Sequence, residues 1–511
     1  MRIIKVLSAT ALISGLSFFY FSPAERRMTN PPGAMRDSPV SAGALEQAVR
    51  YNNDILPTPE PRQTAPGKLP AQDGGATIAP VRDWTVIYYS TTKDILSYSL
   101  ISALLEMKKT GTTDRVNVVV EAALPVRSPS GTLSVPSIRM VLGKAADPEK
   151  IAGYSRLLRR YTEGVIDSAV LKAFSGDIVK TENNADTGDW RRAAEFINWA
   201  RENYPAKRYA LVLFGHGEGF LDRKKFLNNG KGVLIDAVTH NYVTLPELRL
   251  LMAATGKVDL FAMHSCVMQM AEVAYQLRDY ADVIVGSSDL QFGTGYDMRG
   301  FLDALNAAPG ASSKALGADL AAGYVRRIHD RASPRVPGAQ ASALSSSKLQ
   351  GFTARLDAWV DAVMALKDKR VFRTAIHEVV RFDIFAITPK TANAAAARAY
   401  SISGDLYDFV RLINENLPQD DPVSPLARGR GIELMDFIAG ELVAGYSYTG
   451  NSTTGFGLGR AHGLAIHVPP ELFYEDSLEG FNSISETNYW DLPFAKETRW
   501  GTFLNWLYAA K

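Results

Sequence analysis

Short apolar runs alternate with helical patterns through the first half of the folded part of this chain. Strand-like and helix-like segments follow one another over 84–89, 95–109, 116–120, 190–203, 209–214, 245–254, 258–263, 268–277 and 281–286. The strand-like runs are continuously apolar, which is typical of strands buried on both faces of a parallel sheet. Strands that alternate with helices form right-handed crossovers. The pattern therefore predicts an α/β fold, with a largely parallel central sheet between two layers of helices.

Beyond residue 300 the periodicity becomes mainly helical. The predicted helices lie over 313–331, 349–367, 371–382, 405–415 and 431–444. One late apolar strand, at 463–467, has two interpretations: it completes the main sheet, or it belongs to a separate carboxyl-terminal domain. The sequence thus predicts a core over 81–300 and a mainly helical region over 301–511.

The first 80 residues have a different pattern. Arg2 and Lys5 precede an apolar run at 6–21, which is shorter than the ~20 residues that a spanning helix needs. Residues 1–24 are therefore interpreted as an export signal, or as an uncleaved anchor that tethers the protein to the membrane. Residues 25–80 are rich in proline and indicate a linker or pro-segment. The protein is expected to be periplasmic or secreted.

Composition narrows the function. The chain is 46% hydrophobic and 22% charged, an ordinary globular balance, and its formal net charge of +2 gives no reason to expect a nucleic-acid partner. Its single cysteine excludes an intrachain disulfide and a cysteine-rich metal centre.

That cysteine, Cys266, follows the buried strand at 258–263, and His216, flanked by Gly215 and Gly217, follows the strand at 209–214. The carboxyl ends of parallel strands meet at one edge of a sheet, where ligands bind. An imidazole beside a thiol can stabilise the thiolate and later act as general acid. The backbone N–H groups of Gly217 and Cys266 are expected to hold an oxyanion. We therefore predict a catalytic dyad of His216 and Cys266.

The same stretches resemble the clostripain family of cysteine peptidases, which belongs to the caspase-like clan. The similar segments are WTVIYY, DRVNVVVE, FINWARENYPAKRYALVLFGHGEG and VDLFAMHSCVMQMAEVAYQLRDYADVIVGSS, with weaker likeness in DLYDFV and GLAIHVPP. The resemblance implies a three-layer caspase-like sandwich, the dyad of His216 and Cys266, and endopeptidase activity on proteins or peptides through a thioester acyl-enzyme. It also implies a monomer. No cofactor is predicted; some relatives depend on calcium, a property that this sequence does not reveal.

The resemblance leaves the P1 preference open. Family members commonly carry an aspartate two residues before the nucleophile, at the base of the S1 pocket, where it favours arginine or lysine at P1. This chain has His264 there, and an imidazole does not replace a carboxylate as partner of a guanidinium. Asp289 or Asp297 are the candidates to supply the missing charge. The basic loop at 223–231 is a hypothetical site of self-processing.

Other interpretations compete with this one. A lone cysteine is often an inert core residue. His216, His240, His264 and Cys266 are zinc-binding residue types, but the HExxH and CxxC spacings are absent and no metal site is predicted. A catalytically silent caspase-like binding module at the cell envelope is the main alternative function. A ligase, in which an amine resolves the acyl-enzyme, would have the same dyad.

Overall fold

The computed structural model of the protein describes residues 80–509 except 159–163, 223–231, 293–294, 331–336, 383–384, 387–398 and 471–488. The predicted export signal or anchor, nearly all of the proline-rich segment and the basic loop lie outside the described residues. Among the residues that are described, no helix is long and apolar enough to cross a membrane.

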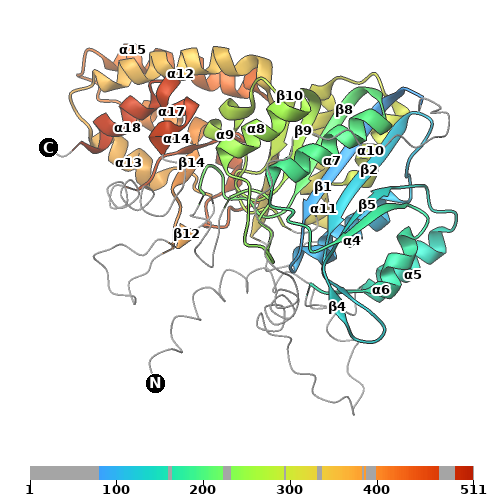
Figure 1. Cartoon of the computed structure of the whole chain (residues 1–511). Helices are drawn as coiled ribbons and strands as arrows, with labels where there is room; N and C mark the ends of the chain where they lie inside the picture. Colours follow the sequence, from blue (N-terminus) through green and yellow to red (C-terminus); the bar gives the residue numbers. More distant parts are fainter. Residues whose placement is uncertain are drawn as a thin grey trace, which may run out of the picture.

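A nine-stranded sheet runs through the described part of the chain (Figure 1). Its strands, in spatial order, are β15 (Val443–Gly450), β11 (Gly338–Ser345), β10 (Ala281–Gly286), β9 (Val258–His264), β8 (Ala206–Phe214), β1 (Arg82–Thr91), β2 (Val116–Ala123), β5 (Pro136–Val141) and β7 (Ile178–Asn183). The five strands from β10 to β2 are parallel, and the outer strands pair antiparallel with their neighbours. Short strands form smaller sheets: β3 (Val126–Arg127), β4 (Leu133–Ser134), β6 (Ile166–Asp167), β12 (Phe385–Ala386), β13 (Ala399–Tyr400), β14 (Ser403–Asp405) and β16 (Ala465–His467).

Helices cover both faces of the sheet, because successive side chains of each buried strand point to opposite sides. Tyr88 and Phe214 belong to the core on one face, and the adjacent Tyr89 and Leu213 belong to the core on the other. The first face packs against α4 (Leu96–Met107), α5 (Pro148–Leu158), α6 (Ser168–Leu171), α10 (Met298–Ala307) and α11 (Ser313–Asp330). The second packs against α7 (Trp190–Asn203), α8 (Leu245–Thr255) and α9 (Ala271–Leu277). The predicted three-layer α/β architecture is confirmed.

The carboxyl-terminal region is mainly helical, as predicted, but it also contributes two strands, β11 and β15, to the main sheet. β11 reads GAQASALS and is buried throughout. Its residues are small because α11 packs closely on the sheet: a Cβ at Gly317 would lie 2.7 Å from Val283 Cγ1 and 3.2 Å from Ala343 Cβ. A strand of small residues gives little hydrophobic signal.

The late apolar strand is β16, and it pairs with β14 in a separate two-stranded sheet. It therefore does not complete the main sheet. The helix expected at 431–444 begins earlier, as α15 (Ser424–Phe437), and continues as a π-helical turn (Ile438–Leu442) before β15. The other helices of this region are α12 (Leu349–Met364), α13 (Arg370–Glu378), α14 (Leu406–Asn416), α17 (Pro493–Glu497) and α18 (Trp500–Tyr508).

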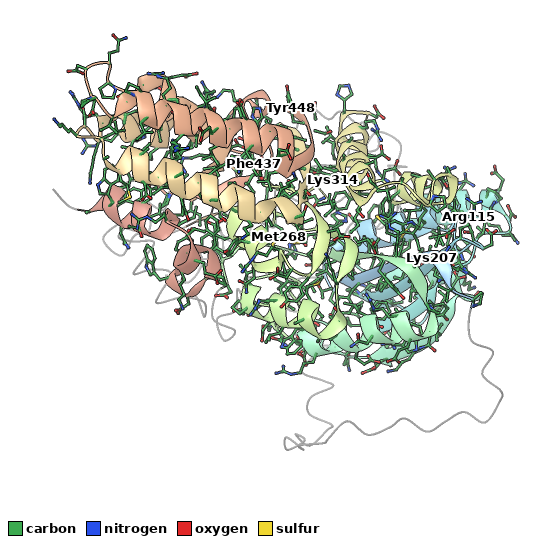
Figure 2. All side chains as sticks on the ribbon, turned by 90° about the horizontal axis from the view of Figure 1, so that it is seen from above. Arg115, Lys207, Met268, Lys314, Phe437 and Tyr448 are labelled. Carbon is green, nitrogen blue, oxygen red and sulfur yellow. The ribbon has the colours of Figure 1, made fainter. Side chains whose placement is uncertain are left out.

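The carboxyl-terminal helices share one hydrophobic core with the sheet. A single cluster of buried side chains extends from Ile87 in β1 to Leu504 in α18. The ring of buried Trp359 contacts Phe409 and Phe503, with centroids 6.4 and 5.9 Å apart. Met268, just after β9, is buried in the same cluster and is labelled in the view from above (Figure 2). Buried packing thus joins the helical region to the sheet.

Trp359→Ala is expected to lower the free energy of unfolding by ~3–5 kcal/mol, because it empties a fully buried site. Urea unfolding followed by far-UV circular dichroism and by reactivity of the single cysteine would measure this. Since the core is continuous, both probes should report one transition at the same lowered midpoint. Two separate transitions would contradict the shared core.

Candidate functional site

The register of β8 and β9 places the two predicted catalytic residues at neighbouring strand ends. Phe214 pairs with His264, so His216 and Cys266 each lie two residues beyond the last pair. Gly217 packs against the other strand exit: a Cβ there would lie 2.8 Å from the Cys266 carbonyl oxygen and 2.7 Å from Ser265 Cβ. The structure therefore brings together His216, Gly217 and Cys266.

A carboxylate that the sequence analysis missed contacts the histidine. His216 Nε2 lies 2.7 Å from Asp94 Oδ2, and Asp94 Oδ1 accepts a hydrogen bond from the Leu96 backbone N–H at 2.9 Å. Asp94 follows β1, the strand next to β8, so it reaches the same sheet edge. Its position just after a buried strand is the signal by which the sequence could have identified Asp94 as a site residue. The contact fixes the orientation of an imidazole whose side chain is 39% exposed.

The cysteine is partly buried, and the loop after β10 lies against its sulfur. The backbone N–H of Gln291 donates to Cys266 Sγ at 3.3 Å. The next residue, Val267, has φ of 58°, in the left-handed region that a β-branched residue rarely adopts. Its N–H donates to the Asp289 carbonyl oxygen at 3.2 Å. Such a conformation persists only where surrounding contacts impose it, as at active sites.

His264 is buried beneath the strand ends. Its ring stacks on Phe214, with centroids 3.9 Å apart, and Gly295 packs against it so closely that a Cβ there would lie 1.9 Å from His264 Cε1. Burial lowers the pKa of His264 to about 3, and the nearby positive charge of Arg327 acts in the same direction. The imidazole is therefore neutral at physiological pH.

The two aspartates considered for the S1 pocket have other partners. Asp289 is buried and accepts hydrogen bonds from the Leu290 N–H at 2.8 Å and from the Thr453 N–H and hydroxyl at 2.8 and 2.5 Å. Asp297 caps α10 by accepting from the Gly300 N–H at 3.1 Å, and it lies 3.6 Å from Arg327 Nη1. Both carboxylates thus stabilise loops and a helix start near the site.

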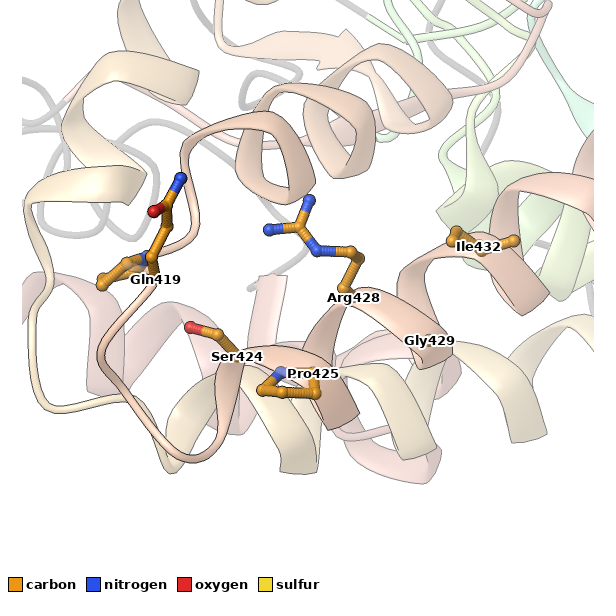
Figure 3. Close-up of a pocket in the computed structure, with 7 residues that line it drawn as sticks. Gln419, Ser424, Pro425, Arg428, Gly429 and Ile432 are labelled. Atoms are coloured by element: carbon orange, nitrogen blue, oxygen red, sulfur yellow. The ribbon is translucent and has the colours of Figure 1, made fainter.

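Within the described ranges, no group of three or more His, Cys, Asp or Glu side chains is arranged to hold a metal ion. His240 directly follows the turn at 237–239 and has φ of 57°. A surface cavity of about 490 Å³ lies in the helical region around the start of α15 (Figure 3), and its lining does not include the predicted site residues. The cavity is lined by Pro418, Gln419, Ser424, Pro425, Arg428, Gly429 and Ile432.

Comparison with known proteins yields one family. The sequence pattern of the Clostripain family matches residues 159–506, more than half of the chain. Clostripain of Hathewaya histolytica is 26% identical over 240 residues, which are 45% of this chain but only 43% of that protein's length.

Two solved structures share the fold, and both are described as secreted C11 cysteine proteases from Bacteroides thetaiotaomicron. The first, bound to an irreversible peptide inhibitor, has a TM-score of 0.50 and 17% identity, covering 83% of this chain and 99% of its own. The second, iotapain, has a TM-score of 0.50 and 15% identity, covering 76% and 94%. At these identities the likeness supports the caspase-like fold alone.

Gly217→Ala is expected to disturb the contact between the two strand exits, because the new methyl group would overlap backbone and side-chain atoms. Such overpacking costs about 1–3 kcal/mol. Thermal unfolding and the alkylation rate of the single cysteine should both change. Gly310→Ala is the matched control, since a Cβ at that position would meet no described heavy atom within 4 Å beyond its chain neighbours. Equal behaviour of the two variants would contradict the close contact.

Proposed function

This chain belongs to the clostripain family of cysteine peptidases, and we propose that it is an exported endopeptidase that cleaves peptide bonds with His216 and Cys266. The observation that carries the proposal is the pairing of β8 with β9 in a register that brings these two residues to adjacent strand ends. Asp94 beside the imidazole supports it.

In the proposed reaction the Cys266 thiolate attacks the scissile carbonyl carbon, and the carbonyl oxygen becomes an oxyanion. The N–H groups of Gly217 and Cys266 stabilise that charge. His216, protonated, gives its proton to the leaving amine as the C–N bond breaks, which leaves a thioester on Cys266. A water molecule then attacks the thioester while His216 takes a proton from it. The C–S bond breaks, the carboxylic acid product leaves, and the thiolate re-forms.

Asp94 orients this chemistry. Its carboxylate accepts the Nε2–H of His216, so proton exchange with substrate goes through Nδ1. A negative charge at 2.7 Å also stabilises the imidazolium that accompanies a thiolate. Asp94 therefore acts through His216 as a positioning residue.

The charges around the predicted S1 base do not favour a basic P1 residue. His264 is neutral, and the carboxylates of Asp289 and Asp297 are engaged by loop and helix donors. A nearby cation, Arg327, donates to the Tyr296 carbonyl oxygen at 3.4 Å and approaches Asp297. We therefore propose a preference for an uncharged P1 side chain.

Export is proposed on two grounds: the apolar run at 6–21 after Arg2 and Lys5, and the fold shared with proteases described as secreted. The proposed partners are protein or peptide substrates. We propose that the peptidase acts as a monomer.

Cys266→Ala is expected to abolish peptide cleavage, and His216→Ala is expected to lower its rate by about 10²–10⁴-fold. Asp94→Asn should cause a smaller loss in kcat, because the dyad remains but the imidazole is less well held. A fluorogenic peptide library varied at P1, cleaved by the chain from residue 81 onward, would measure all three. Full activity in His216→Ala would reject the dyad, and inactivity of every form would favour a silent binding module.

His264→Asp is expected to shift P1 preference toward arginine and lysine, because it introduces a carboxylate at the predicted S1 base. A charged hydrogen bond contributes about 1.5–3 kcal/mol, which corresponds to about 10- to 100-fold in kcat/KM. His264→Asn, which adds no charge, is the control and should leave the preference unchanged. A wild-type protein that already cleaves best after arginine or lysine would overturn the proposed specificity.

A further inference from the structure

A buried ion pair lies next to the residue that orients the histidine. Lys93 immediately precedes Asp94, and its Nζ lies 2.5 Å from Asp236 Oδ2. The two residues are 1% and 0% exposed. Lys93 Nζ also donates to the Ala185 carbonyl oxygen. A charge pair removed from water to this extent is costly unless its other hydrogen-bonding positions are filled.

Asp236 has those further partners. Its Oδ2 accepts from the N–H and hydroxyl of Thr187, both at 2.9 Å, and its Oδ1 accepts from the N–H groups of Val238 and Thr239 at 3.0 and 3.1 Å. Burial tends to raise the pKa of Asp236, but Lys93 and these donors lower it below its usual value, so the carboxylate is charged at neutral pH. The pair thus ties together the exit of β1, the segment 185–188 and the segment 232–243.

The segment 232–243 also holds the catalytic histidine. Val233 and Val243 exchange backbone hydrogen bonds at 2.9 and 2.8 Å and close a hairpin. Within it, the Leu234 N–H donates to the His216 carbonyl oxygen at 3.2 Å. Leu234 does so at φ of 55°, a conformation that a bulky residue adopts only when its surroundings require it. The hairpin must therefore be fixed from elsewhere.

We propose that Lys93 and Asp236 are positioning residues for the peptidase reaction, whose ion pair locks the 232–243 hairpin onto the exit of β1. The ion pair keeps the Leu234 N–H in its hydrogen bond to the His216 carbonyl oxygen, and it keeps the Asp94 carboxylate beside the His216 imidazole. This inference rests on the proposed dyad.

The two single variants should differ in their effect on the alkylation midpoint of Cys266. Asp236→Asn leaves a buried ammonium next in sequence to Asp94, where it competes with His216 for the carboxylate and weakens the imidazolium. Lys93→Met removes that cation and leaves Asp236 with its four other donors. Among the described residues, further ionisable groups lie near this contact: Tyr89 donates to the Thr187 carbonyl oxygen, and Asp186 accepts from Thr239 and Asn241. The charges of Glu121 and Arg192 also act on Tyr89.

The test uses the full chain and measures the iodoacetamide alkylation rate of Cys266 against pH, together with kcat and KM. Because Cys266 is the only cysteine, the alkylation signal has one source. Asp236→Asn should raise the pH midpoint of Cys266 alkylation by about one unit. At pH values below that midpoint, kcat should therefore fall about tenfold, while KM should change less than about twofold. Lys93→Met should lower kcat without raising the midpoint. The double variant should return the midpoint toward the wild-type value.

Asp177→Asn is the matched control, because Lys108 and Asp177 form another buried ion pair in the same half of the chain. It should lose stability but keep the wild-type midpoint and kcat. A wild-type midpoint in Asp236→Asn, or an equal shift in Asp177→Asn, would overturn the proposal. If Asp236→Asn does not fold, the Lys93→Met variant provides the test. A wild-type kcat in Lys93→Met would then overturn the proposal. If His216→Ala leaves the alkylation midpoint of Cys266 unchanged, the dyad itself is rejected.

Discussion

The parallel register between β8 and β9 is the constraint on which the site depends. Side chains alternate along a strand, so a slip of one residue would turn every side chain of β9 to the opposite face. The observed register aligns Phe214 with His264, the last residues of the two strands, and His216 and Cys266 each lie two residues beyond that pair. Apolar side chains on both faces of both strands fix that register, because each face packs against its own helical layer. Core packing thereby places the two residues that we propose to be catalytic.

Charge is distributed unevenly around the proposed dyad. On the histidine side lie Asp94 and the buried pair of Lys93 and Asp236, all supplied by segments that leave β1 or lie against it. On the cysteine side, His264 is neutral and stacked between Phe214 and Gly295. The proposed imidazolium thus has a carboxylate on one side, while the strand beneath the proposed thiolate presents a neutral ring.

The sequence predicted the parts that depend on periodicity. These are the central parallel strands, most helices, and the two strand ends that precede His216 and Cys266. It missed β11, because a strand that packs closely against α11 must consist of small residues and so carries little apolar signal. Asp94 was missed because periodicity does not show which way a loop side chain points. Asp297 stands before a helix start, and its capping role follows a rule that could have been applied. The export signal or anchor and the linker predicted within residues 1–79, and the self-processing site predicted at 223–231, remain predictions.

The continuous core has a consequence for chain connectivity. If the backbone were cut between Asp222 and Gly232, the two fragments would still share the β8–β9 pairing, the buried Lys93–Asp236 contact and one hydrophobic cluster. They would separate on a denaturing gel yet migrate together under native conditions. Refolding from denaturant would then become a bimolecular reaction, with a rate that depends on protein concentration, whereas the uncut chain refolds at a rate independent of it.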